Sequence, residues 1–425
     1  MGLKVAVIGG GSTYTPELIE GLADRRERLP IDELVLHDID DRRLQLVGGL
    51  AGRMLRRMEW PGRLTLTTDR DAAVDGADFV LVQLRVGGQA ARLLDETLPL
   101  RFGTIGQETT GAGGLAKALR TVPIVLELAD LVRRRAAPGA WIVDFTNPVG
   151  IVTQALLDEG HRAIGLCNVA ISLQRSIARR LGVDPDSLAL GHVGLNHLSW
   201  ITEVHQDGRD LLPEILAAHG AEIADEIGLT PDRLRELHAV PSYYLRYYYA
   251  FDDVLAEQRG GHHRAEEVME IERRLLEMYA DPALDTKPTL LEGRGGAWYS
   301  VAAARLLASL HDGAADIQVV DVRNDGAAPD LAPGDVVEVP SRIDRDGAHP
   351  LPQEPMAPEM RDLVRAVKRF ERLAIRAARS GSRNDVREAL AAHPLVGGHL
   401  DDVGPLLDAL LEANRPYLPA FEPAT

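Results

Sequence analysis

Short apolar runs alternate with longer stretches of helical periodicity along the first 170 residues. Between the apolar runs, helical spacing of apolar residues marks 16–22, 41–58 and 115–135. The runs themselves have the length of buried strands: Leu3–Ile8, Glu33–Asp38, Leu64–Thr68, Phe79–Leu84, Trp141–Phe145 and Ala163–Leu166. Because strands separated by helices form parallel sheets covered on both faces, the pattern predicts a Rossmann-type, doubly wound α/β domain over residues 1–170.

The pattern changes after residue 170. Helical periodicity now dominates, with a few β-rich pieces at 317–322 and 335–340. The helical segments are Asp210–His219, Thr230–His238, Arg264–Met278 and Met360–Ser380. This mixture predicts a second, mixed α/β (α+β) domain over residues 171–425 that packs on the first.

Composition excludes several classes of function. The formal net charge is −17, which argues against a nucleic-acid partner because phosphates would repel the chain. No run of about 18 apolar residues is present, so no membrane span is expected. The single cysteine cannot form an internal disulfide and the N-terminus lacks a signal-peptide pattern, so we expect a cytoplasmic protein. A local basic pocket for a small phosphorylated ligand is compatible with this charge.

A glycine turn separates the first predicted strand from the first predicted helix. It consists of Gly9, Gly10, Gly11 and Ser12. Glycines let the backbone approach a pyrophosphate at a helix N-terminus, and Asp38, at the end of the second strand, can accept from ribose hydroxyls. Asp38 lies further along than the usual spacing of about 20 residues, and the full glycine fingerprint is not met. The order of elements predicts nucleotide binding, and an ordinary strand-to-helix turn is the alternative.

Two polar loops follow other predicted strands. Asn147, in Thr146-Asn147-Pro148, would face the ligand crevice at the carboxyl end of a parallel strand, where its amide could bind a cofactor and a sugar hydroxyl. A simple Asn-Pro turn is the alternative. The second loop is expected to run from Arg85 to Arg92 and onward through residues 106–114. Its arginines and glycines suit close approach to an anion. The alternative for either arginine is a side chain that is merely solvated.

Cys167 and His197 are a possible pair of metal ligands. Cys167 ends the sixth predicted strand, and His197 follows in Gly194-Leu195-Asn196-His197. A lone cysteine is usually a small buried hydrophobe, and a lone histidine is usually structural. Two protein ligands would leave an open site, as a catalytic metal requires. A thiolate, an imidazole and oxygen ligands do not identify one metal.

The ordered set of motifs resembles glycoside hydrolase family 4, the NAD- and divalent-metal-dependent glycosidases. The resemblance covers at least residues 3–300, and the remainder weakly. The motifs are Ile8-Gly9-Gly10-Gly11-Ser12-Thr13-Tyr14-Thr15-Pro16, Arg85-Val86-Gly87-Gly88, Gly106-Gln107-Glu108-Thr109, Thr146-Asn147-Pro148, Cys167-Asn168, Leu195-Asn196-His197, Tyr244-Leu245-Arg246-Tyr247-Tyr248 and His263-Arg264-Ala265-Glu266-Glu267-Val268. It implies a lactate/malate dehydrogenase-like fold whose second domain carries the substrate and metal site and the oligomer contacts.

The chemistry implied by this resemblance is unusual for a glycosidase. In the family, NAD takes a hydride from sugar C3 and a tyrosine removes the C2 proton. The C1–O bond then breaks by elimination, water adds, and the hydride returns, so that the net reaction is hydrolysis. The metal, typically Mn²⁺, acts as a Lewis acid on the C2 and C3 oxygens.

The resemblance also implies roles for individual residues. Cys167 and His197 match the metal ligands, and Tyr244 matches the base, although Tyr243 or Tyr247 could hold that role. Glu108 matches a position that affects the tyrosine. Substrate contacts are implied at Arg92, Asn147 and Arg264, and on weaker grounds at Arg294 in Arg294-Gly295-Gly296-Ala297.

The residue after the cysteine separates the substrate classes of the family. Asn168 matches the members that hydrolyse 6-phospho-β-glucosides, because an amide cannot serve as the carboxylic acid found in the α class. Ala170 replaces the proline usual in the β class, so a different glycoside stays open as an alternative. Arginine pairs would suit a 6-phosphate.

Two other functions share some of these features. A 2-hydroxy-acid dehydrogenase of the malate or lactate type also carries the glycine turn and Thr-Asn-Pro, but it needs an Asp-x-x-Arg element that residues 167–173 lack. A non-catalytic NAD sensor would not need Cys167, His197 and a tyrosine cluster together. The family resemblance further implies a homodimer or homotetramer.

Overall fold

Six parallel strands form the centre of the molecule. The structure is a computed structural model that describes residues 2–261, 263–295, 298–418 and 421. The strands lie in the order β6-β5-β4-β1-β2-β3, which is the order of a Rossmann fold. Their bounds are β1 Leu3–Ile8, β2 Ile31–His37, β3 Arg63–Thr67, β4 Phe79–Val82, β5 Trp141–Asp144 and β6 Ala163–Gly165. The predicted doubly wound parallel sheet is confirmed.

Apolar side chains cover both faces of this sheet. Val5 and Val7 of β1 belong to one buried cluster, whereas Ala6 and Ile8 belong to another on the opposite face. Because successive residues of a strand point to opposite faces, both faces must be apolar, and β1 therefore reads as a continuous hydrophobic run. Because both faces of the sheet are buried, its strands could be recognised in the sequence as short apolar runs.

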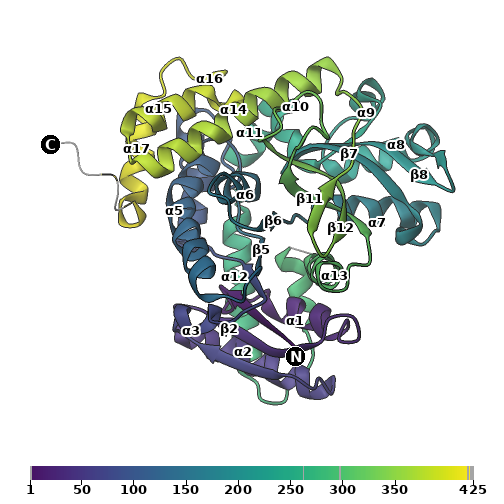
Figure 1. The fold of residues 1–425 in the computed structure, drawn as a ribbon. Helices are drawn as coiled ribbons and strands as arrows, with labels where there is room; N and C mark the ends of the chain where they lie inside the picture. Colours follow the sequence, from purple (N-terminus) through teal and green to yellow (C-terminus); the bar gives the residue numbers. More distant parts are fainter. Residues whose placement is uncertain (1, 262, 296–297, 419–420, 422–425) are drawn as a thin grey trace.

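Helices connect the parallel strands and lie on both sides of them, as Figure 1 shows. Their bounds are α1 Thr15–Ala23, α2 Asp41–Arg57, α3 Arg70–Val74, α4 Gly88–Thr97, α5 Gly111–Arg135, α6 Val149–Asp158 and α7 Val169–Leu181, with a 3-10 turn η1 at Pro99–Phe102. The helix predicted to begin at Leu115 begins at Gly111 and contains Pro123.

The loop predicted between Arg85 and Arg92 is wrong, because α4 starts at Gly88 and carries Arg92. Gly87, with φ +81, lets the chain turn into this helix. The buried face of α4 includes the charged residues Asp95 and Glu96. The apolar stripe by which helices are recognised in a sequence is therefore interrupted, and the sequence pattern predicts a loop instead.

Strands from the second half of the chain extend the same sheet. β11 Asp316–Arg323 pairs antiparallel with β6, and β12 Val336–Asp344 and β13 Gly347–Pro350 follow. A second, antiparallel sheet contains β7 Ala189–Leu195, β8 Leu198–Gln206, β9 Arg209–Asp210 and β10 Val240–Pro241. The mixed second part is confirmed, whereas the boundary at residue 170 stays a prediction.

The remaining helices surround these sheets (Figure 1). The helix predicted at Asp210–His219 continues through Gly220 and is therefore longer than predicted. It ends before Gly228, whose φ of +68 is typical of a residue that follows a helix C-terminus. The bounds are η2 Pro185–Ser187, α8 Leu212–Ile227, α9 Pro231–Leu237, η3 Tyr243–Leu245, α10 Arg246–Tyr249, α11 Phe251–Arg259, α12 Arg264–Tyr279, η4 Thr289–Arg294, α13 Tyr299–Asp312, α14 Pro358–Ser380, α15 Arg383–Ala392, α16 Pro394–Gly397, α17 Gly404–Asn414 and η5 Arg415–Tyr417. Among the described residues, none of the helices combines the length and apolar character needed to cross a bilayer.

Candidate active site

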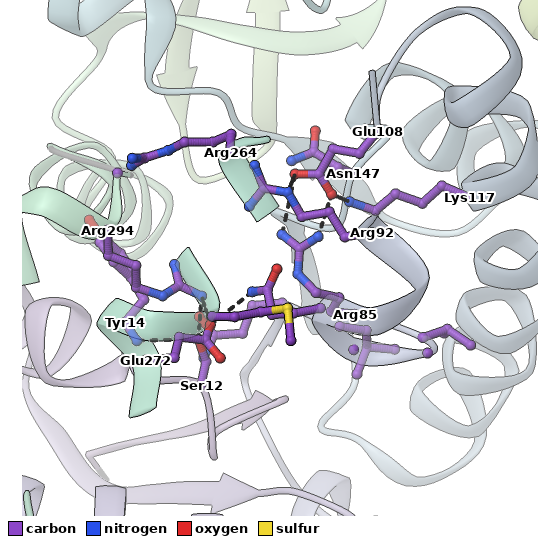
Figure 2. Close-up of a pocket in the computed structure, with 18 of the residues that line it drawn as sticks. Ser12, Tyr14, Arg85, Arg92, Glu108, Lys117, Asn147, Arg264, Glu272 and Arg294 are labelled. Atoms are coloured by element: carbon purple, nitrogen blue, oxygen red, sulfur yellow. Dashed lines mark hydrogen bonds and ion pairs between the residues drawn. The ribbon is translucent and has the colours of Figure 1, made fainter. Parts of the chain in front are cut away.

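A cleft of about 1610 Å³ lies at the carboxyl ends of the parallel strands. Figure 2 shows side chains from distant parts of the chain pointing into it. Most of the residues predicted to be functional line it: Gly9, Gly11, Ser12, Asp38, Arg92, Glu108, Asn147, Asn168, His197, Tyr244, Arg264 and Arg294. Gly10 and Cys167 are not among the lining residues. Residues 296 and 297, which complete the motif after Arg294, lie outside the described residues.

The glycine turn has the geometry of a nucleotide-binding turn. Gly9 has φ +92, and a Cβ at this position would come within 2.6 Å of the Gln83 carbonyl oxygen. A Cβ at Gly11 would meet the carboxylate of Asp38 at 2.8 Å, and the Gly11 N–H donates to that carboxylate at 2.9 Å. These positions therefore accept only glycine without a shift of the neighbouring groups.

Arg294 lies beside this turn. Its Nε donates to Thr13 Oγ1 at 2.8 Å, and its Nη2 lies 3.1 Å from Glu272 Oε1. Glu272 of α12 also accepts from Arg43 and Gln89, so one buried carboxylate joins four segments. Arg294 and Arg43 hold the pKa of Glu272 below its usual value, although burial opposes this. Figure 2 shows Glu272, Arg294 and Ser12 of the glycine turn close together.

Asn147 follows β5 and has an unused acceptor. Its Oδ1 is buried without a hydrogen-bond partner among the described residues. The neighbouring Thr146 is satisfied, because its hydroxyl donates to Val82 O and accepts from Leu84 N. An orphaned buried oxygen at the cleft indicates a ligand group that donates to it.

Cys167 and His197 come from the end of β6 and from the β7–β8 turn. His197 has φ +63, and its Nδ1 lies 2.9 Å from Thr109 Oγ1. Burial lowers the pKa of His197 to about 4, so the imidazole is neutral and can coordinate through Nε2. Burial, with Glu338 nearby, raises the pKa of the Cys167 thiol well above its usual value. A bound cation would favour the thiolate, and the pair thus fits a divalent metal.

The described residues hold no cluster of three or more His, Cys, Asp or Glu side chains arranged for a metal. A metal bound by Cys167 and His197 would therefore take further ligands from water or from substrate oxygens.

Tyr244 lies directly on the His197 ring. The two ring centroids are 3.7 Å apart and the planes differ by 16°. The rings of Tyr243 and Tyr247 are instead tilted against the ring of Tyr244, with centroid distances of 4.4 Å and 6.3 Å. Burial raises the pKa of Tyr244 well above its usual value, so the phenol needs a cation to act as a base.

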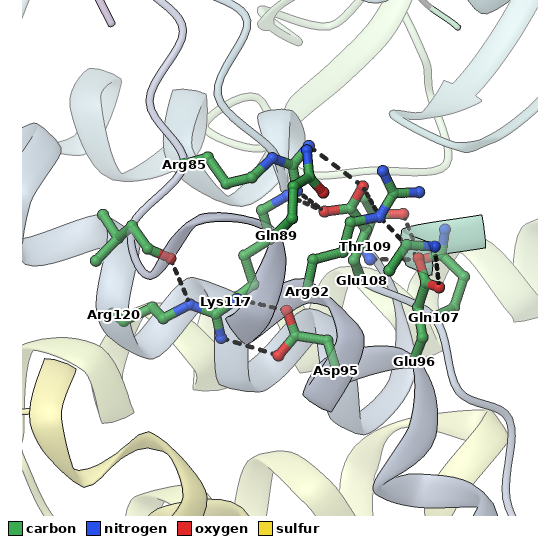
Figure 3. Close-up of polar contacts among 12 residues, drawn as sticks. Arg85, Gln89, Arg92, Asp95, Glu96, Gln107, Glu108, Thr109, Lys117 and Arg120 are labelled. Atoms are coloured by element: carbon green, nitrogen blue, oxygen red, sulfur yellow. Dashed lines mark hydrogen bonds and ion pairs between the residues drawn. The ribbon is translucent and has the colours of Figure 1, made fainter. Parts of the chain in front are cut away.

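Glu108 is held by three cations. Its carboxylate contacts Arg85 Nη1, lies 2.5 Å from Lys117 Nζ, and lies 3.2 Å from Arg92 Nε. Although burial favours the protonated form, Arg85, Lys117 and Arg92 hold the pKa of Glu108 well below its usual value. We name these four residues the Glu108 clamp. Figure 3 shows how α4, α5 and the turn after β4 supply the cations.

The clamp is tied to Arg264. Arg92 Nε also lies 2.7 Å from Glu96 Oε1, and Glu96 Oε2 accepts from Ala265 N at the start of α12 at 2.8 Å. Arg264 itself is half-exposed and pairs with Glu267 at 2.7 Å. Glu96 thus links Arg92 to the backbone next to Arg264, whereas the Arg264 side chain is held by Glu267 and by the carbonyl of Gly293.

The sequence interpretation missed Lys117, Glu96 and Glu272. Each lies inside a helix, where a buried charged residue has no distinctive local pattern. One signal could still have identified such a residue: a charged side chain at a helix position that periodicity places on the buried face. Lys117, between Ala116 and Ala118 of α5, is an example.

Comparison with known proteins gives a consistent result. Residues 4–183 match "Family 4 glycosyl hydrolase", and residues 192–396 match "Family 4 glycosyl hydrolase C-terminal domain". A probable 6-phospho-beta-glucosidase of Bacillus subtilis is 41% identical, with 99% of this chain and 98% of the relative covered. A 6-phospho-alpha-glucosidase of Leptotrichia buccalis is 29% identical, with 99% of each chain covered.

Solved structures agree with the fold. The 6-phospho-beta glucosidase of Thermotoga maritima, solved with manganese, NAD⁺ and glucose-6-phosphate, has a TM-score of 0.92 and 36% identity over 98% of this chain and 99% of that one. A lactate dehydrogenase from a deep-sea metagenome library has a TM-score of 0.54 at 14% identity over 89% of this chain and 99% of that one. The second likeness concerns the fold alone, and it confirms the predicted lactate dehydrogenase-like architecture.

Proposed function

The chain belongs to the family 4 glycosyl hydrolases, and on this premise we propose that it hydrolyses 6-phospho-β-glucosides with NAD and a divalent metal, Mn²⁺. The observation that carries the proposal is the convergence of the glycine turn, Asn147, His197 and Tyr244 on one cleft. Relatives named for this activity, with identities up to 41% over nearly the whole chain, support it.

The two cofactors would occupy adjacent parts of the cleft. The glycine turn and Asp38 would hold NAD, and Cys167 with His197 would hold the metal. When bound, NAD supplies a hydride acceptor and donor for sugar C3, and the metal supplies Lewis-acid stabilisation of charge on the sugar oxygens. Asn147 would donate its amide, or accept through its orphaned Oδ1, where cofactor and sugar meet.

Tyr244 would remove the proton from sugar C2. Its stacking on His197 places the phenol beside the proposed metal ligand, where positive charge lowers a phenol pKa. Arg92 is a second cation near Tyr244, and its positive charge interacts favourably with the ionised phenol. Glu108 would act on Tyr244 through Arg92, which it holds at 3.2 Å. Among the ring contacts of the described residues, Tyr243 and Tyr247 contact Tyr244 and not His197.

The β-configuration follows from Asn168. Asn168 lines the cleft next to Cys167, and an amide cannot donate the proton that a carboxylic acid would give to the leaving group of an α-glycoside. The higher identity to the β-glucosidase relative than to the α-glucosidase relative supports the same choice. A family 4 glycosidase acting on a different glycoside is the alternative, because Ala170 departs from the family pattern.

The sugar phosphate would bind among the arginines. Arg92 and Arg264 line the cleft on the side of the Glu108 clamp, and guanidinium groups bind phosphate in two-pronged geometry. Arg294 lies against Ser12 and Thr13, so we place its role at the border of the cofactor and the sugar. A cytoplasmic location and a homo-oligomeric state belong to the same proposal.

Hydrolysis of p-nitrophenyl β-glucoside-6-phosphate tests this function. The assay runs with and without NAD, Mn²⁺ and reductant, and with unphosphorylated and α-linked compounds alongside. We expect release of p-nitrophenol only when NAD and metal are both present, with no net NADH. Release from another glycoside alone would keep the mechanism and change the substrate. Net NADH from a 2-hydroxy acid would replace the proposal with a dehydrogenase.

A further inference from the structure

Lys117 is a buried cation whose partner already has two others. Its side chain is only 2% exposed, and its Nζ lies 2.5 Å from Glu108 Oε2. Arg85 and Arg92 contact the same carboxylate. Figure 2 shows these three cations converging on Glu108 from different sides. A carboxylate that two arginines already neutralise does not need a third cation for its stability, because burying an ammonium group is costly.

The charges of the clamp and of the neighbouring Glu96 do not balance when Lys117 is protonated. The positive groups are Arg85, Arg92 and Lys117, whereas the carboxylates are Glu108 and Glu96, which pairs with Arg92. One positive charge is therefore in excess. The group lines the cleft, so the excess charge lies where an anionic ligand would bind.

The other charged groups near Lys117 do not cancel this excess. Asp95 of α4 faces Lys117, but it is engaged by both terminal nitrogens of Arg120 (Figure 3). Arg120 also donates to Val86 O and to Asn414 Oδ1. The charges of Asp95 and Arg120 therefore neutralise each other and leave the charge of Lys117 uncompensated. His197 faces the clamp from the β7–β8 turn and is neutral.

Lysine is the member of the clamp that can lose its proton. Arginine stays protonated in proteins, whereas a buried lysine titrates readily. Burial and the neighbouring Arg85 lower the pKa of Lys117 to about 7, although Glu108 and Asp95 counteract this. The clamp and Glu96 together are therefore neutral in the free enzyme once Lys117 has lost its proton.

We propose that Lys117 is a specificity-determining residue for anionic sugars, which takes up a proton when the anion binds and thereby supplies the positive charge that favours it. The inference rests on the proposed function, because the anion is the phosphate of the sugar. A phosphate dianion in the cleft stabilises the charged ammonium. By reciprocity, the charged ammonium strengthens binding of the phosphorylated sugar over the neutral one.

Calorimetric titration of glucose-6-phosphate into the enzyme loaded with NAD and Mn²⁺ tests the proposal. Titrations at pH 8 in buffers of different ionisation enthalpy give the number of protons taken up. At this pH the ligand is already a dianion, because its second pKa is about 6. We expect wild-type enzyme to take up more than about half a proton per sugar, since Lys117 is mostly neutral before binding.

Three variants separate charge from titration. Lys117→Arg keeps the charge but cannot titrate, so we expect wild-type affinity or better, with this proton uptake lost. Lys117→Met lacks the charge, so we expect the affinity for glucose-6-phosphate to fall about tenfold, again without uptake. Lys287→Arg is the matched control, because Lys287 pairs with Glu17 and Glu20 of α1 and does not line the cleft.

The outcomes are distinguishable. Equal proton uptake by wild type and Lys117→Arg would overturn the inference and leave the proposed function intact. No binding of glucose-6-phosphate to wild type would overturn both. Should Lys117→Arg not fold, the pH dependence of the wild-type dissociation constant decides: it must rise between pH 7 and 9 for glucose-6-phosphate, and a flat profile refutes the role of Lys117.

Discussion

Replacement of Tyr244 by phenylalanine isolates the proposed base. The substitution keeps the ring that stacks on His197 at 3.7 Å and removes only the hydroxyl. Loss of one hydroxyl and its hydrogen bond changes the free energy of unfolding by about 1 kcal/mol. Loss of a general base lowers kcat by about 10² to 10⁴, which corresponds to roughly 3 to 5 kcal/mol in the activation free energy. The variant should therefore fold normally and lose almost all activity.

The size of this effect depends on the metal. At an ordinary pKa of about 10, roughly one phenol in a thousand is ionised at pH 7, and burial of Tyr244 reduces that fraction further. A nearby cation must therefore lower the pKa of Tyr244 before the phenol can act as a base at pH 7. Chelation should therefore strongly reduce the activity of wild type.

Steady-state hydrolysis and exchange of the sugar C2 hydrogen with deuterated water measure the two effects. Tyr243→Phe and Tyr247→Phe are the matched controls, since each removes the same atom from a ring that lies against Tyr244. Both should retain C2 exchange. A kcat of Tyr244→Phe within about threefold of wild type, or exchange lost in a control instead, would refute the choice of Tyr244.

Three further predictions concern the metal, the ligand and the stability of the fold. Cys167→Ser should lose bound Mn²⁺ and activity, as measured by metal analysis after dialysis and by hydrolysis; full metal content in this variant would exclude Cys167 as a ligand. Asn147→Ala should raise KM for sugar or NAD about 3- to 10-fold with unchanged thermal unfolding, because its Oδ1 has no partner among the described residues to lose. Burial lowers the pKa of His393 to about 3, so the unfolded chain binds one more proton than the folded chain between pH 3 and 6.5. Stability should then be fully present above pH 6.5 and fall with acidification by up to about 1.4 kcal/mol per pH unit, and denaturant titrations of His393→Asn should show a shallower fall.

The parallel sheet could be predicted because its signals are local. The apolar run of β1 reports burial on both faces, and the glycine turn after it reports close approach of backbone to backbone, as Gly9 and Gln83 illustrate. Helix α4 could not be predicted in the same way, since Asp95 and Glu96 are buried against charges rather than against apolar groups. The addition of β11 to β6 joins Asp321 to Gly165, a pairing that no local pattern reports.

The candidate site divides in a similar manner. Asn147, which stands at a strand end, could be placed in the cleft from the sequence, because strand ends of a parallel sheet meet at one edge. The family resemblance added the roles of Asn168 and Tyr244. The partners that hold the arginines could not be placed, since Lys117 and Glu272 reach the cleft from helix interiors whose neighbours are decided by tertiary packing.

Two buried carboxylates organise the cationic cleft. Glu272 holds Arg43 and Arg294 on the cofactor side, and Glu108 holds Arg85 and Arg92 on the sugar side. Each carboxylate fixes arginines that arrive from separate elements, so their guanidinium groups are oriented before any ligand binds. Preorganised charges lose little free energy to reorganisation when an anion arrives. A chain with a net charge of −17 can therefore still attract a phosphorylated sugar, because the two buried carboxylates Glu108 and Glu272 hold arginines at the cleft.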